Sequence, residues 1–285
     1  MTRCPVCGGA LTPWVEKMNR AVYRCASCGH INVPAGVVRR ADGLTIYESD
    51  DSIFEADGNA DYYFDDTNAD AAREKLAYVA RFAKPGGRLF DVGASYGHFL
   101  VEAQKQYEAS GIEVSPGATR WAQSTFHVDV SVGSVYDIPS SRAYDAVTFW
   151  DVVEHLDDPG AGLDRIRECL KPGGLLFLST PDAGSLVARL MDARWHYLDP
   201  IQHVNLFSRK TLVRLARDRG LSLVHYTYFG RSYRLSYIVN RVAYLLRGPG
   251  ASSSSASAGS SDAFWNVAIP LKLWDVMGLV LRADR

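Results

Sequence analysis

The stretch Leu89-Phe90-Asp91-Val92-Gly93-Ala94-Ser95-Tyr96-Gly97-His98-Phe99 decides the fold of this chain. An apolar run ends in an acid, passes through a turn of small residues and continues into a helical pattern. That order predicts a buried strand, a tight loop and a helix, which is the junction where open α/β sheets bind their ligands. Gly93 and Gly97 can adopt dihedrals closed to other residues, so a ligand can approach the backbone there.

The loop over residues 93–97 is compatible with several functions. A dinucleotide fold needs G-x-G-x-x-G, which is absent because Gly93 and Gly97 stand four apart. The same residues match the G-x-S-x-G of a nucleophile elbow, with Ser95 in the centre. They also match an S-adenosylmethionine loop, acidic-x-G-x-G-x-G, in which Ser95 replaces the middle glycine. A turn that binds nothing is the structural alternative.

The residues downstream predict the rest of an α/β sheet. Residues 109–115 predict a second strand, and its Glu113 lies about twenty positions after Asp91, where a doubly wound fold places the acid that accepts ribose hydroxyls. A hydrolase has no use for that acid. A helix is expected from Pro159, and another over 209–219 with Ser208 as its N-cap. Further strands are expected over 128–132, 144–150, 175–179, 221–229 and 278–282.

Taken together, these motifs resemble those of class I S-adenosylmethionine-dependent methyltransferases. The evidence is DVGASYG from Asp91, GIEVSP from Gly111, GSVYDIP from Gly133, YDAVTFWDVVEHL from Tyr144 and LKPGG from Leu170, in that order and spacing. The resemblance implies a seven-stranded, doubly wound, Rossmann-like sheet. It also implies S-adenosylmethionine as the methyl donor.

The resemblance implies roles for individual residues as well. Glu113 would bind the ribose, and Ser134 and Val135 would line the adenine. Ser134 stands where the family often has an acid. Asp151, at the end of the fourth strand, would be a rim acid of the cofactor site. The methionine end would be held by Asp91, Gly93, Ala94 and Gly97.

Four of the five cysteines form two C-x-x-C pairs near the start of the chain: Cys4, Cys7, Cys25 and Cys28. Each pair forms a tight turn that directs two thiolates to one point, and four soft ligands suit tetrahedral zinc. With four protein ligands no coordination site remains for a substrate, so the zinc is expected to be structural. A disulfide pair and a rubredoxin-like iron site are the alternatives. Cys169 is expected to be plain core.

Composition excludes few functions. Lys and Arg number 31 against 32 acids, so no global charge indicates a nucleic-acid binder. No apolar run reaches the roughly 18 residues of a membrane span, and the first residues lack a signal-peptide core. We therefore expect a cytoplasmic protein.

The motifs predict the following organisation. A zinc ribbon over 1–45 and an acidic linker or lid over 46–70, anchored by aromatic residues such as Tyr47, precede a cofactor-binding core over 71–230. A helix is expected to begin at Asp70. Residues 231–275 predict an insertion with apolar helices, basic residues and a disordered serine-rich loop, and 276–285 supply the last strand. The basic helix, 231–247, is expected either to contact a membrane at the inner face or to cover the pocket or a second subunit.

Methyl transfer to oxygen or nitrogen needs a positioned base, and histidine titrates in the right range. His155 follows the fourth strand at the pocket rim, and His203 lies in a loop that would fold over the pocket. We therefore predict that His203 or His155 is the base of a small-molecule methyltransferase. A sugar or natural-product intermediate with a hydroxyl or amine is the expected acceptor. The alternatives are a methyltransferase of RNA or protein, and a non-enzymatic binding module led by the ribbon.

Overall fold

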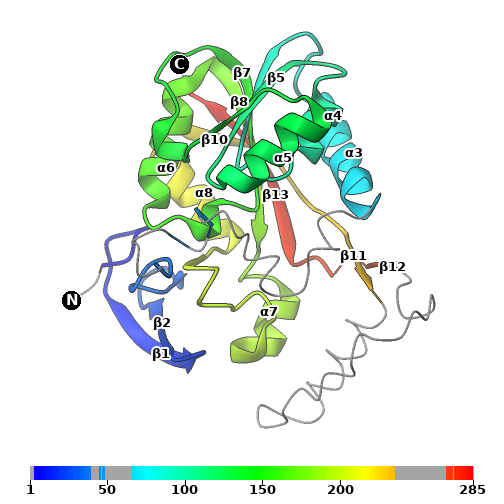
Figure 1. Ribbon diagram of the computed structural model, residues 1–285. Helices are drawn as coiled ribbons and strands as arrows, with labels where there is room; N and C mark the ends of the chain where they lie inside the picture. Colours follow the sequence, from blue (N-terminus) through cyan, green and yellow to red (C-terminus); the bar gives the residue numbers. More distant parts are fainter. Residues whose placement is uncertain are drawn as a thin grey trace, which may run out of the picture.

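A computed structural model describes residues 3–39, 45, 47–48, 66–234, 268–271 and 273–284. Its centre is a seven-stranded sheet in the order β10-β13-β8-β7-β4-β5-β6, shown in the upper part of Figure 1. The strands are β4 (Arg88–Val92), β5 (Glu108–Glu113), β6 (Val130–Val132), β7 (Tyr144–Trp150), β8 (Leu170–Pro181), β10 (Leu221–Tyr228) and β13 (Val276–Ala283).

The order of the strands places the ligand site. From β4 the chain runs through β5 to β6 on one side, and then crosses to β7 on the other side of β4. The strands from β6 to β8 pair in parallel, whereas β13 is antiparallel to both of its neighbours. The point where the order reverses, between β4 and β7, is where doubly wound sheets bind ligands. The predicted seven-stranded α/β fold is confirmed.

Helices cover both faces of the sheet because its strands bury alternate residues on opposite sides. Leu89 packs in one cluster with α3 (Asp66–Ala80), α4 (His98–Ala103) and α5 (Pro116–Phe126). Its neighbour Phe90 packs in the other cluster, with α6 (Pro159–Cys169) and α8 (Arg209–Arg217). Cys169 is fully buried in that second cluster, as expected.

Side-chain caps begin three of these helices. Ser115 accepts from the amide of Ala118 at α5, Asp158 from the amide of Ala161 at α6, and Ser208 from the amide of Thr211 at α8. Such caps satisfy donors that have no partner within the helix. The remaining short helices are η1 (Val135–Asp137), η2 (Val153–His155), α7 (Leu186–Met191) and η3 (Asp192–Arg194).

The cysteine-rich segment forms a second, antiparallel sheet with β1 (Leu11–Lys17), β2 (Arg20–Cys25), β3 (Ile31–Asn32) and β9 (Asn205–Leu206). Its last strand therefore comes from the opposite half of the chain. In Figure 1 the strands β1 and β2 of this sheet, in blue, lie below the large sheet and beside α7.

Asn205, fully buried, joins the ribbon to the core. Its Oδ1 accepts from His30 Nε2 at 3.1 Å and from Asn32 Nδ2 at 3.0 Å, and its Nδ2 donates to the carbonyl of Leu156 at 2.6 Å. Burial lowers the pKa of His30 to about 4, against the opposing effect of Asn205, so its ring is neutral. One amide therefore connects β3 and the residue before it to the segment that follows η2.

Three sequence predictions need correction. The helix expected from Asp70 begins at Asp66, inside the acidic run. β8 begins at Leu170 rather than 175, with a register shift opposite Tyr144 and Ala146. The expected basic helix over 231–247 does not begin as a helix. Residues Arg231–Arg234 form strand β11 and pair antiparallel with β12 (Ala268–Leu271), and this pairing satisfies the backbone groups of both strands.

The remainder of the insertion, 235–267, lies outside the described residues, so its contact with a membrane or a second subunit stays a prediction. No helix among the described residues is long and apolar enough to cross a membrane.

Replacement of Asn205 by alanine tests the junction between ribbon and core. It would leave His30 and Asn32 without their buried acceptor, and each such loss costs about 1–3 kcal/mol. We expect a lower free energy of unfolding, and faster amide exchange in β2 and β3 than in β4. Denaturant titration and hydrogen exchange measure both. Thr12→Ala, which removes an exposed bond to the carbonyl of Arg24, is the control. Equal exchange in wild type and Asn205→Ala would contradict this role.

Candidate functional site

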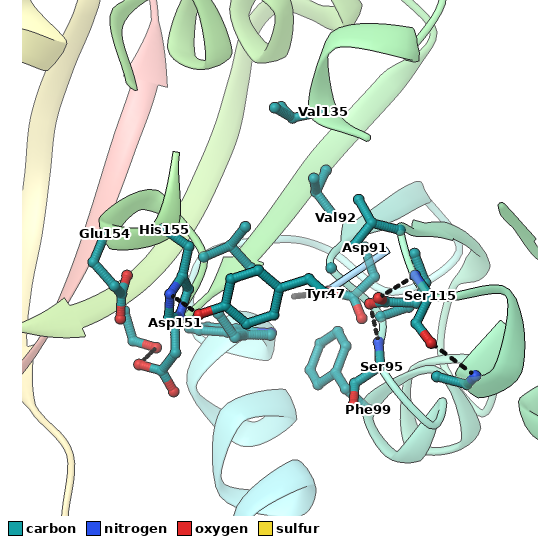
Figure 2. A pocket seen from close by; sticks show the side chains of 18 of the residues that line it. Tyr47, Asp91, Val92, Ser95, Phe99, Ser115, Val135, Asp151, Glu154 and His155 are labelled. Carbon is teal, nitrogen blue, oxygen red and sulfur yellow. Dashed lines mark hydrogen bonds between the residues drawn. The ribbon is translucent and has the colours of Figure 1, made fainter. Parts of the chain in front are cut away.

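A cavity of about 1030 Å³ opens at the carboxyl ends of the parallel strands. Loops after β4, β5, β6 and β7 line it, together with residues 197–203 and part of 37–48. Figure 2 shows Asp91, Ser95 and Ser115 on one side of the cavity and Asp151, Glu154 and His155 on the other, with Tyr47 between them. The site thus has two polar ends in one enclosure, of a size suited to a cofactor and a small second ligand.

The loop after β4 requires its glycines. Gly93 has φ 78°, and a Cβ there would lie 2.5 Å from Cγ2 of Val152. Gly97 has φ 81° and packs against Ala122 and Val128. Gly97 does not line the cavity, so its contribution is to the shape of the loop. Gly93 and Ala94 do line it.

Glu113 fixes this loop from the next strand. The backbone amide of Ser95 donates to Oε2 at 2.8 Å, and that of Ser115 donates to Oε1 at 2.9 Å. Ser95 has a φ of 50°, in the left-handed region that is unfavourable for non-glycine residues. Burial raises the pKa of Glu113, and the backbone amides act in the opposite direction. Glu113, the acid that ends the second predicted strand, is therefore hydrogen-bonded to the loop of small residues that the sequence predicted.

Asp91 lies deeper, at the end of β4. Thr148 Oγ1 donates to its Oδ1 at 2.6 Å. Burial raises the pKa of Asp91 to about 7, although the Thr148 bond and the charge of Lys75 lower it. Burial of a carboxylate is unfavourable, so a buried carboxylate with a raised pKa in a cavity wall is a candidate for binding a ligand.

Ser134 and Val135 line the cavity at the start of η1. The amide and hydroxyl of Ser134 donate to Oδ2 of Asp137 at 2.8 and 2.6 Å, and these bonds lower the pKa of Asp137. Ser134 is thus tied to an acid three positions later. Val135 is buried and supplies an apolar wall.

At the other end, Asp151 also has a left-handed backbone, with φ 56°. Ser179 Oγ donates to its Oδ1 at 2.9 Å, and Nζ of Lys75 lies 3.6 Å from Oδ2. Lys75 lies in turn over the ring of Trp150, 5.2 Å from its centroid. Two strained non-glycine residues, Ser95 and Asp151, thus line one cavity, which is typical of functional sites.

Both sequence-predicted histidines line the cavity, with ring centroids 5.0 Å apart. Nδ1 of His155 donates to the carbonyl of Gln202 at 2.8 Å, and the hydroxyl of Tyr47 lies 2.8 Å from the same nitrogen. Burial lowers the pKa of His155, despite the Gln202 carbonyl and Asp151. Nδ1 of His203 donates to the carbonyl of Tyr197 at 2.7 Å. The structure therefore brings His155 and His203 together, and the expected anchor Tyr47 holds one of them.

The cavity lining also includes Glu154, Lys75 and Trp150, which the sequence motifs did not predict. Glu154 is 1% exposed, and Thr180 Oγ1 donates to its Oε2 at 2.9 Å. Glu154 directly precedes His155 in the segment that follows β7, and this position in the sequence could have predicted it as a site residue. Lys75 and Trp150 reach the cavity through tertiary packing of α3 on β7, which no local pattern reveals.

Comparison with known proteins gives the same fold and a family. A family model described as a methyltransferase domain matches residues 64–226. The ubiquinone biosynthesis O-methyltransferase of Xanthomonas campestris is 40% identical over 116 residues, which is 37% of this chain and 48% of that protein. The chain thus spans about half the length of this relative.

Two solved structures show the same architecture. A SAM-dependent methyltransferase of Thermotoga maritima, titled a possible histamine N-methyltransferase, has a TM-score of 0.52 at 18% identity, covering 82% of this chain and 98% of that one. A putative methyltransferase of Bacillus halodurans has a TM-score of 0.57 at 11% identity, covering 75% and 99%. At these identities the likeness establishes the fold alone.

Asp91 gives the site a testable dependence on pH. Burial raises the pKa of Asp91 from 3.8 to about 7, so the contribution of this group to stability falls as the pH rises from 4 to 7. Asp91→Asn keeps an oxygen for Thr148 and removes the buried charge. We therefore expect the variant to melt above wild type at pH 8, with the difference narrowing toward pH 4, while Asp129→Asn, at an exposed acid, changes neither. Parallel melting curves for wild type and Asp91→Asn across this range would refute the raised pKa.

Proposed function

Because the chain belongs to the methyltransferase domain family, we propose that it transfers a methyl group from S-adenosylmethionine to a hydroxyl of a small molecule. The choice of oxygen is supported by the O-methyltransferase name of the Xanthomonas relative. A sugar or natural-product intermediate remains the acceptor that we propose. Family membership argues against the alternative of a non-enzymatic binding module.

The single observation that carries this proposal is one cavity with two chemically different ends. At the first end, Glu113 would accept the ribose hydroxyls, Asp91 and the loop after β4 would hold the methionine part, and Ser134 and Val135 would border the adenine. At the second end lie His155 and His203, where the acceptor would bind. The sulfonium methyl would then point from the first end toward the second.

Methyl transfer from a sulfonium is an in-line displacement, so alignment of the two ligands supplies much of the rate. An acceptor hydroxyl must also lose its proton near the moment of attack. Two histidines can serve this need in two ways. One of them can accept the proton at Nε2, or both can hold a cation that acidifies the hydroxyl.

An RNA or protein acceptor is the second candidate. The near balance of 31 basic and 32 acidic residues offers no general attraction to RNA. Incubation with methyl-labelled S-adenosylmethionine and separate pools of small metabolites, RNA and protein tests the choice. We expect the label in the small-molecule pool. The labelled product should be stable to base, because a methyl ether, unlike a methyl ester, does not release methanol. Label confined to RNA or protein would contradict the small-molecule acceptor.

Glu113→Ala tests the cofactor assignment. Loss of a charged, buried acceptor of two hydroxyls costs about 2–3 kcal/mol, or roughly 30- to 150-fold in affinity. Calorimetry with S-adenosylhomocysteine should show this loss. Glu108→Ala, at the exposed start of the same strand, should keep wild-type affinity. Wild-type affinity in Glu113→Ala would contradict the assignment of Glu113 to cofactor binding.

The four cysteines of the ribbon fit a zinc ion. No disulfide joins them, and their sulfurs all lie within 4.8 Å of one another. Cys4 Sγ lies 3.7 Å from Cys28 Sγ, and Cys7 Sγ lies 3.5 Å from Cys25 Sγ. A tetrahedral zinc with bonds of about 2.3 Å spaces its sulfurs about 3.8 Å apart. We propose that the ribbon holds one structural zinc, which stabilises a sheet too small to fold alone.

Metal analysis of the purified chain should therefore find about one zinc per chain. Cys28→Ser should lower this content and destabilise the ribbon, whereas Cys169→Ala, in the core, should keep the zinc. A disulfide between these cysteines, or fresh protein without metal, would exclude the zinc site.

A further inference from the structure

A second group of metal-ligand residues lies at the acceptor end of the cavity. Glu154 and His155 come from η2, and His203 comes from the loop before β9. A donor atom of each residue lies within 4.8 Å of the donors of the other two. The three residues meet because the amide of Val204 donates to the carbonyl of Glu154 at 3.0 Å, which ties the two segments together.

The two histidines are oriented as metal ligands are. Nδ1 of His155 and Nδ1 of His203 each donate to a backbone carbonyl, at 2.8 and 2.7 Å. A carbonyl can only accept, so in each neutral ring the proton is on Nδ1 and the lone pair is on Nε2. Metal-bound histidines almost always show this outer hydrogen bond, which fixes both the tautomer and the direction of the ring.

Glu154 distinguishes a cation site from a simple base. One histidine is enough to accept a proton, whereas Glu154, which is 1% exposed, adds a carboxylate oxygen to the two imidazole nitrogens and so completes a set of metal ligands. Thr180 holds one oxygen of Glu154 at 2.9 Å. A carboxylate has about four lone-pair positions, so Thr180 and a cation can share it.

We propose that Glu154, His155 and His203 bind a divalent cation, which in turn binds the acceptor hydroxyl. Two imidazoles and one carboxylate suit ions such as Mn²⁺, Fe²⁺ or Zn²⁺. Three protein ligands leave coordination positions open toward the cavity, as in catalytic rather than structural sites. An acceptor with a second oxygen beside its hydroxyl can fill two of them. This inference rests on the proposed function, because it assigns the means by which that hydroxyl is activated.

The reaction then needs no base among the histidines. The hydroxyl loses its proton to water when its oxygen binds the cation, because a cation lowers the pKa of a bound hydroxyl. A lone pair of that oxygen attacks the methyl carbon of the sulfonium and forms the C–O bond. The C–S bond breaks with its electron pair on sulfur. The products are a methyl ether and the neutral thioether S-adenosylhomocysteine.

Binding of Mn²⁺ alone tests the site without any acceptor, since the thiolates of the ribbon favour softer ions. Paramagnetic resonance of protein that carries about one zinc per chain, enough for the ribbon alone, should show about one bound Mn²⁺ per chain. Glu154→Gln and His203→Gln should weaken it by at least about 100-fold, the upper range for loss of an outer-shell partner. His127→Asn, an exposed histidine with a left-handed backbone that asparagine tolerates, is the matched control.

Calorimetry with S-adenosylhomocysteine on the same variants separates this inference from the proposed function. We expect Glu154→Gln to lose Mn²⁺ while its cofactor affinity and melting temperature stay at wild-type values. Wild-type protein that binds S-adenosylhomocysteine but takes up no Mn²⁺ at millimolar concentration would overturn the cation site alone. Equal Mn²⁺ affinity in wild type and both variants would overturn it too. Protein that binds Mn²⁺ but no S-adenosylhomocysteine would instead contradict the proposed function.

Discussion

The two backbone amides that donate to the Glu113 carboxylate hold the cofactor end of the cavity in place. Ser95 keeps a left-handed backbone, which costs about 1–3 kcal/mol, and its amide donates to Oε2 at 2.8 Å. A hydrogen bond to a charged acceptor contributes about 1.5–3 kcal/mol, so this one bond is enough to offset the strain. The amide of Ser115 fixes the other oxygen. The loop after β4 and the start of α5 are therefore set by one side chain, before any ligand binds.

The acceptor end depends on a different connection, between distant parts of the chain. Asn205 binds His30 and Asn32 of the ribbon and the carbonyl of Leu156, next to His155. Tyr47, from the segment after the ribbon, reaches His155 itself. The ribbon thus contacts the residues that shape the acceptor end, so the zinc that we propose at Cys4 and its partners would influence the site indirectly. It would do so by positioning η2 and the loop that carries His203.

Local patterns predicted the core of the molecule well. Local sequence was enough to predict the strand that contains Asp91, the glycine loop and Glu113, because each depends on residues nearby in the chain. The cluster of the two C-x-x-C turns was predictable from their spacing. The pairing of β3 with β9 could not be predicted, because each strand has only two residues and therefore shows no periodicity in its sequence. Glu154 was not predicted because its carboxylate belongs to the proposed ligand set only together with His203. Tertiary packing brings His203 there from a separate loop. β11 was misassigned because its apolar and basic residues suit a helix as well as a strand.

We propose that one cavity holds the cofactor at Glu113 and directs its methyl group toward Glu154, His155 and His203. A crystal structure of the chain with S-adenosylhomocysteine tests it most directly. We expect both ribose hydroxyls within hydrogen-bond distance of the Glu113 carboxylate, and the thioether sulfur facing the two histidines. A ligand whose sulfur faces away from His155 and His203, or whose ribose lies apart from Glu113, would contradict it.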